Sequence, residues 1–109
     1  MYELERNVDL SFLKGRECIQ VCVGLYQVIL HLDESIRLSI ESTCQLNGKV
    51  VKTYGRLCSL LGQEVVAVRQ EGGGSLVMTF DNGDVLEITD DNPGTESYQI
   101  SAPGVDIIV

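Results

Sequence analysis

The stretch 80–96, FDNGDVLEITDDNPGTE, combines side chains that could do chemistry, because it holds six carboxylates and no Lys, Arg or His. The six acids are Asp81, Asp84, Glu87, Asp90, Asp91 and Glu96. Carboxylate and amide oxygens at even spacing can bind calcium, and Asp90, Asn92 and Glu96 have such spacing. The EF-hand order D-x-[DN]-x-[DN]-G is not met, however, and Pro93 replaces a spacer. We therefore expect no metal site here.

Other candidates for catalysis are few. His31 is the only histidine and falls on the polar side of an alternating stretch, which favours a structural or surface role. The loop EGGGS (71–75) lacks the GK[ST] ending of a phosphate-binding loop and lies between two predicted strands, so we interpret it as a hairpin connection. The cysteines form no CxxC pair and are interpreted as small buried hydrophobes without a disulfide or zinc; they are Cys18, Cys22, Cys44 and Cys58. The sequence predicts no catalytic residue and no cofactor, and hence no enzyme.

Charge is strongly segregated along the chain. Residues 1–69 contain eight basic and eight acidic residues, whereas residues 70–109 contain eight acidic residues and no base. The whole net charge of −8 therefore belongs to the second segment. Such a field repels nucleic acid and anionic membranes and attracts cationic surfaces. We expect no nucleic-acid or membrane partner, and two interpretations stay open: a solubilising face or a binding surface for a basic protein.

Length and composition indicate one globular domain over residues 1–109, with 44% apolar and 22% charged residues. The first residues show no long apolar run followed by a small-residue cleavage site, which is the pattern of a secretory signal. No apolar run approaches the ~20 residues that span a bilayer. We expect a cytoplasmic protein. The sequence leaves the oligomeric state open, including dimerisation through an exposed strand edge.

An internal repeat relates about 13–46 to about 60–100. Gly15 matches Gly62, Glu17 matches Glu64, and, after one inserted residue, Asp33 matches Asp81; a run of apolar positions matches between them. A weaker echo sets CQL (44–46) against YQI (98–100). Each copy alternates apolar and polar residues with a period of two, which predicts strands.

The apolar pattern also selects a turn length. In the second copy, a two-residue loop would put Leu86 and Phe80 on opposite faces of the hairpin. A three-residue loop at 81–83 puts both on one face, with Gly83 in the left-handed position of a bulged turn. The first copy allows the same register through 33–35.

The resulting fold class is all-β and mostly antiparallel. Two tandem related β-meanders are expected to pack their apolar faces together as a sandwich or flattened barrel. One short helix is predicted near 54–61, ending at Gly62. Strands are predicted near 17–23, 26–32, 36–42, 44–52, 64–70, 75–80, 84–89, 96–101 and 105–109.

Several short motifs resemble a known family: LKGR (13–16), SIE (39–41), LLG (60–62), GSLVMTFDNG (74–83), ESYQI (96–100) and the final IIV. The sequence resembles a family of small bacterial β-domain proteins of unknown function, some of which look like immunity proteins encoded beside toxins of contact-dependent growth inhibition systems. The resemblance covers nearly the whole chain. Its motifs are turn and core positions, and it carries over no catalytic residue.

The acids, together with this resemblance, suggest an acidic immunity-type protein that binds and neutralises a cognate toxin, a basic nuclease being the expected kind. The alternatives are a non-enzymatic accessory or scaffold β-module and, third, a ligand-binding or enzymatic barrel. Hairpin geometry puts the two ends of the acidic strip about 17–20 Å apart, at turns away from the apolar faces, so its charges should be replaceable without loss of fold. The expected partner-binding residues are Asp81, Asp84, Glu87, Asp90, Asp91, Glu96 and, by the repeat, Glu34.

Overall fold

The protein is described by a computed structural model that covers residues 9–71, 74–89 and 97–108. Two 3-10 helices lie in these ranges, η1 (Ser11–Leu13) and η2 (Tyr54–Leu60). The strands are β1 (Cys18–Val23), β2 (Val28–Leu32), β3 (Ile36–Ile40), β4 (Cys44–Leu46), β5 (Lys49–Val50), β6 (Val65–Gln70), β7 (Leu76–Phe80), β8 (Val85–Ile88), β9 (Tyr98–Ala102) and β10 (Val105–Ile108). All strand pairs are antiparallel, so the predicted fold class is confirmed.

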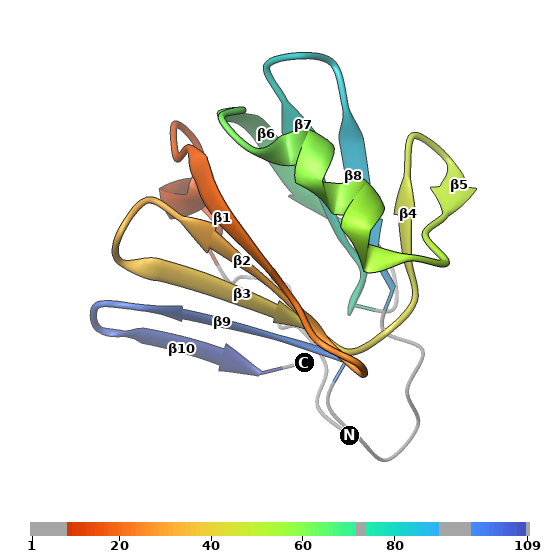
Figure 1. Ribbon diagram of the computed structural model, residues 1–109. Coiled ribbons are helices and arrows are strands. Elements are labelled where there is room, and N and C mark those ends of the chain that lie inside the picture. Colours follow the sequence, from red (N-terminus) through yellow and green to blue (C-terminus); the bar gives the residue numbers. More distant parts are fainter. Residues whose placement is uncertain (1–8, 72–73, 90–96, 109) are drawn as a thin grey trace.

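The strands form two five-stranded sheets that face each other as an open sandwich (Figure 1). One sheet has the order β1-β2-β3-β9-β10 and the other the order β5-β4-β8-β7-β6. Each sheet therefore takes three consecutive strands from one half of the chain and two from the other half. The two meanders exist as predicted, but the last two strands of each half cross to the opposite sheet.

The weak echo between residues 44–46 and 98–100 marks this exchange. Cys44 of β4 pairs with Ile88 of β8, and Tyr98 of β9 pairs with Ile40 of β3. Because Ile40 and Ile88 are equivalent positions of the repeat, β4 and β9 make the same contact in opposite sheets. The exchange joins the two halves by main-chain hydrogen bonds in addition to apolar packing.

The core lies between the sheets and is built from the alternation seen in the sequence. Along β2, the side chains of Val28, Leu30 and Leu32 are buried, whereas Ile29 and His31 are half-buried. Strand β3 adds buried residues in the same sheet with the same alternation. Strands β7 and β8 supply the apolar residues of the facing sheet, and in β7 Val77 is buried as well. Helix η2 runs alongside β1 and closes one side of the core with two leucines. At roughly 1.5–3 kcal/mol for each fully buried apolar side chain, this core is the main source of stability.

The pseudo-twofold relation extends to single backbone hydrogen bonds. The Gly15 N–H donates to Val65 O (2.7 Å), and the equivalent Gly62 N–H donates to Cys18 O (2.8 Å). Both edge strands, β1 and β6, carry a register shift at the equivalent place, after Cys18 and after Val65. The sequence repeat therefore corresponds to a structural repeat.

The predicted turn register is confirmed in both copies. Phe80 N–H donates to the carbonyl of Asp84 across the three-residue loop (2.8 Å), and Gly83 has the left-handed φ of 93° that the bulged turn requires. In the first copy Leu32 pairs with Ile36 across the same loop length, but there the positive φ, 56°, belongs to Asp33. Aspartate tolerates this region better than most residues, which explains how the turn forms without glycine.

Two predicted elements differ from the structure. The single strand expected at 44–52 is a hairpin, β4–β5, because Asn47 and Gly48 form a two-residue turn with φ values of 55° and 81°. The helix expected near 54–61 is present, but it is a 3-10 helix. No helix among the described residues is both long and apolar enough to cross a membrane.

Candidate functional site

The two equivalent β-turns each hold a carboxylate against the backbone of the neighbouring edge strand. The Glu64 N–H donates to Asp81 Oδ1 (3.1 Å), and Asp81 N–H donates back to Glu64 O (2.8 Å). In the first copy the Glu17 N–H donates to Asp33 Oδ1 (3.2 Å), and Asp33 N–H donates to Glu17 O (2.8 Å). These aspartates therefore tie their turns to the strand starts, which is why their position repeats.

The segments that lead into the two edge strands meet at the junction of the sheets. Glu17 and Glu64 form an isolated antiparallel bridge, so two like-charged residues lie directly opposite each other. We call Glu17, Asp33, Glu64 and Asp81 the acidic junction. Three of its members are exposed and Asp33 is half-buried. Like charges in such a pair are mutually unfavourable, and a cation bound between them would relieve the repulsion.

The charge of the junction is balanced on one side only. Arg16 Nη1 lies 3.3 Å from Asp33 Oδ2, and Arg16 Nε also donates to Phe12 O (2.9 Å). The residue equivalent to Arg16 in the second copy is Gln63, which has no charge. Of this cluster only Asp81 was predicted from the sequence as a binding residue. The repeat, which matches Glu17 with Glu64 and Asp33 with Asp81, was the signal that could have indicated the others.

Asp84 has a structural role that the sequence did not predict. Its carboxylate accepts hydrogen bonds from Asn47 Nδ2 (3.0 Å), Asn82 Nδ2 (2.9 Å) and Ser59 Oγ (3.5 Å). These bonds, led by the one from Asn47, lower the pKa of the Asp84 carboxyl below its ordinary value. Asp84 joins the β7–β8 turn to the β4–β5 turn and to η2. In contrast to the expectation from the sequence, the structure predicts that Asp84, like Asp81, cannot be replaced without a cost to stability.

The remaining predicted residues are spread over both sheets. Glu87 is half-buried on the outer face of the second sheet, where it pairs with Gln45 of β4 and Val77 of β7. Glu34 is exposed in the β2–β3 turn, next to Asp33 of the acidic junction. Three more lie outside the described residues: Asp90, Asp91 and Glu96.

All four cysteines, which lie in the described part of the chain, are free thiols. Cys18 and Cys44 are buried, and burial raises the pKa of each thiol to about 11. Cys58 is exposed. His31 is half-buried on β2 between Gln20 and Arg37. Within the described ranges, no three His, Cys, Asp or Glu side chains are arranged to hold a metal ion.

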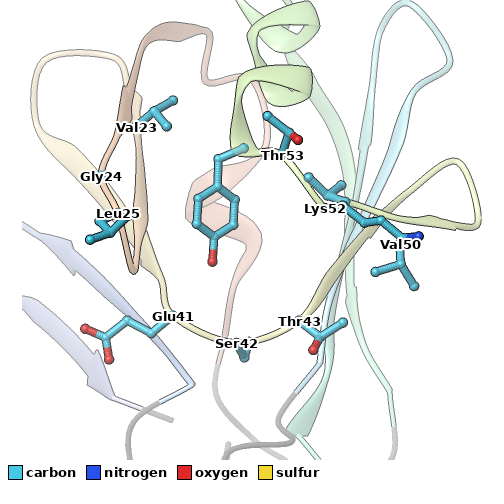
Figure 2. Close-up of a pocket in the computed structure, with 11 residues that line it drawn as sticks. Val23, Gly24, Leu25, Glu41, Ser42, Thr43, Val50, Lys52 and Thr53 are labelled. Carbon is cyan, nitrogen blue, oxygen red and sulfur yellow. The ribbon is translucent and has the colours of Figure 1, made fainter.

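A groove of about 540 Å³ opens between the β1–β2 loop, the β3–β4 connection and the start of η2 (Figure 2). Its ionisable side chains are Glu41, Lys52 and Tyr54. These three ionisable side chains include no nucleophile paired with a base.

The comparison with known proteins supports the part of the resemblance that concerns a family of unknown function. A family model described as "Family of unknown function (DUF6188)" matches residues 10–109. The chain belongs to this family. No curated protein and no solved structure matches it. The matched segment contains both copies of the repeat and the whole acidic junction, so these features belong to the region that the family model describes.

Proposed function

We propose that the protein is an acidic, non-enzymatic binding module of the immunity type, which neutralises a cognate toxin by covering a basic surface of it. A nuclease fits this role, because enzymes that cut nucleic acid need basic clefts for phosphate groups. Binding would involve the acidic junction, Glu34 and Glu87, together with the predicted residues outside the described ranges.

The observation that carries the proposal is the segregation of negative charge in the second part of the chain, on a two-sheet β-sandwich. Residues 70–109 hold eight acids and no base, and the acidic junction adds Glu17 and Glu64 on the neighbouring strand starts. Hydrogen bonds fix Asp33 and Asp81 in place, so the surface is ordered before a partner arrives. A pre-organised acidic surface speeds association with a basic partner and loses less entropy on binding.

An accessory or scaffold β-module is the second candidate. The favouring observation is that the carboxylates of Asp33, Asp81 and Asp84 all stabilise turns, which explains part of the negative charge without a partner. The immunity role requires carboxylates that accept no turn hydrogen bond, such as those of Glu64 and Glu87, for binding to the toxin. The scaffold role does not require them.

The test uses the polypeptide encoded by the adjacent reading frame, produced with and without this chain. We expect it to stop growth alone and to be harmless when the chain is present. The double variant Glu64→Lys/Glu87→Lys should lose protection and bind at least about tenfold more weakly, mainly through slower association. Its fold should persist, because neither carboxylate accepts a turn hydrogen bond and the new cation at position 64 would face Glu17.

The matched control is Glu3→Lys/Glu5→Lys, which changes the net charge by the same amount in the half of the chain where charges balance. It should protect nearly as well as the unmodified chain. If both double variants lost protection against the toxin equally, only the net charge of the chain would matter, and not the position of the acids. An adjacent polypeptide that is not toxic, or whose toxicity this chain does not reduce, would refute the immunity role.

A further inference from the structure

The loop between β1 and β2 presents large apolar side chains to solvent. Leu25 is 83% exposed and Tyr26 is 82% exposed, and Val23 beside them is 53% exposed. Residues 18–30, CIQVCVGLYQVIL, contain no charged residue in a chain of net charge −8. A contiguous exposed apolar patch in such a protein indicates an interaction site.

The internal repeat provides a control within the same molecule. The equivalent connection between β6 and β7, EGGGS (71–75), joins its strands with three glycines and no apolar side chain. In the first copy the backbone closes the loop, since Gly24 N–H donates to Gln27 O (2.8 Å). Leu25 and Tyr26 are therefore not needed to form the hairpin, and their presence requires another explanation.

The groove described above lies directly beside this loop. Val23 and Leu25 line one wall and Val50, itself 47% exposed, lines the other. Figure 2 shows Glu41 on the side of Leu25 and Lys52 on the side of Val50, with the lysine extending toward that valine. Both charged residues are exposed. The molecule thus carries a protruding apolar loop next to a groove of mixed lining, which has valines on both walls, polar residues such as Ser42 and Thr43 between them, and charges of opposite sign at the two rims.

We propose that a second copy of this chain occupies the groove, forming a twofold-symmetric dimer in which Leu25 and Tyr26 of each protomer insert into the groove of the other. A twofold axis near the loop and the groove lets the loop of each protomer enter the groove of the other. Both protomers then use the same surface patch, which is the defining property of an isologous interface. The same axis brings Glu41 of one protomer toward Lys52 of its partner, so the rim charges are complementary. Tyrosine and leucine at the centre with ionic groups at the rim is a usual interface composition.

The salt dependence of this dimer is opposite to that of toxin binding. Each copy carries a charge of −8, so approach of two copies is opposed by long-range repulsion that added salt screens. Dimerisation should therefore strengthen with salt, whereas attraction between the acidic surface and a basic toxin should weaken. The inference does not rest on the proposed function, and either can fail alone.

Sedimentation velocity over about 5 to about 500 μM chain, at low and high salt, tests the proposal. The unmodified chain should dimerise with a dissociation constant on the order of tens of micromolar, lower at high salt. Leu25→Ser/Tyr26→Ser should remain monomeric. Its melting temperature should equal that of the unmodified chain at concentrations where both are monomeric, because the two side chains lie in solvent in the monomer. The matched control Leu61→Ser/Val66→Ser removes apolar residues that are 43% and 47% exposed elsewhere, and it should dimerise normally.

A charge exchange tests the twofold geometry. Lys52→Glu should weaken the dimer at least about fivefold, and the added change Glu41→Lys should restore it to within about twofold. A chain that stays monomeric at the highest concentration overturns the proposal, and so does equal weakening by the control pair. Failure of the charge exchange to restore the dimer overturns the proposed arrangement. A monomeric chain whose Leu25→Ser/Tyr26→Ser variant loses toxin binding would assign the loop to the toxin instead.

Discussion

Replacing Asp84 by alanine tests whether the acidic strip is partly structural. The variant leaves two asparagine side chains, at 47 and 82, without the carboxylate that now accepts their hydrogen bonds at 3.0 and 2.9 Å. Net hydrogen bonds to charged groups contribute about 1.5–3 kcal/mol when buried, but these are in contact with solvent, so about 0.5–1 kcal/mol each is appropriate. The third bond, from Ser59 at 3.5 Å, adds little. The expected loss is about 1–2 kcal/mol of unfolding free energy.

Urea unfolding at neutral pH measures this loss, and the melting temperature should fall by about 4–8 °C for each kcal/mol. The effect must also depend on pH. Because the folded-state pKa of Asp84 is lowered, its contribution is fully present above the ordinary carboxyl pKa of 3.8 and disappears as pH falls through the folded value. The unmodified chain and Asp84→Ala should therefore converge in stability as the pH falls below 3.8.

Glu34→Ala is the matched control, since it removes an exposed carboxylate from the turn of the other sheet. It should change stability by less than about 0.5 kcal/mol. The reasoning is wrong if Asp84→Ala is as stable as this control, or if its deficit stays constant down to acidic pH. A confirmed deficit would also mean that charge reversal at Asp84 cannot be used to locate a binding surface, because loss of binding would then reflect loss of fold.

Three further predictions concern the core, a turn and the thiols. Leu30→Ala should lower the unfolding free energy by about 2–5 kcal/mol, because Leu30 is fully buried between the sheets; a loss below about 1 kcal/mol in urea unfolding would contradict this packing. Gly83→Ala should cost about 1 kcal/mol or more through its φ of 93° alone, since no atom lies within 4 Å of the added methyl group; an unchanged melting temperature would contradict the bulged turn. Iodoacetamide should modify Cys58 in the folded protein, but Cys18 and Cys44 only after unfolding, as mass spectrometry of alkylated peptides would show; equal rates would contradict their burial and raised pKa values.

The sequence predicted what depends on local pattern. The period-two alternation gave the faces of the strands, and the requirement that Phe80 and Leu86 share a face gave the turn length. It did not predict that β4 and β9 change sheets, because alternation determines which side of a strand is apolar and says nothing about which strand lies beside it. The hairpin at 44–50 was missed although Asn47-Gly48 is a strong turn signal, because its second strand has only two residues.

The candidate site was predicted less completely for the same reason. Counting the acids along the chain predicted Asp81 but not Glu17 and Glu64, which approach each other only when the two copies pack about the pseudo-twofold axis. Asp84 looked like its neighbours in composition, and only the position of Asn47 in space distinguishes it. The exposure of Leu25 and Tyr26 likewise follows from tertiary structure, since the predicted strands 17–23 and 26–32 placed Leu25 between strands and Tyr26 at the start of one without indicating that either is exposed.

The exchange of strands between the sheets has a consequence for synthesis. Strand β3 pairs with β2 on one side, but its other edge stays unpaired until β9 has been synthesised, about sixty residues later. Until β9 emerges from the ribosome, the nascent first half exposes a sheet edge that can pair with another chain. The second half meets no such delay, because β4 is already made when β8 appears. The growing polypeptide is therefore most vulnerable to aggregation in the interval before Tyr98–Ala102 is translated, and neither half can reach its final hydrogen bonding alone.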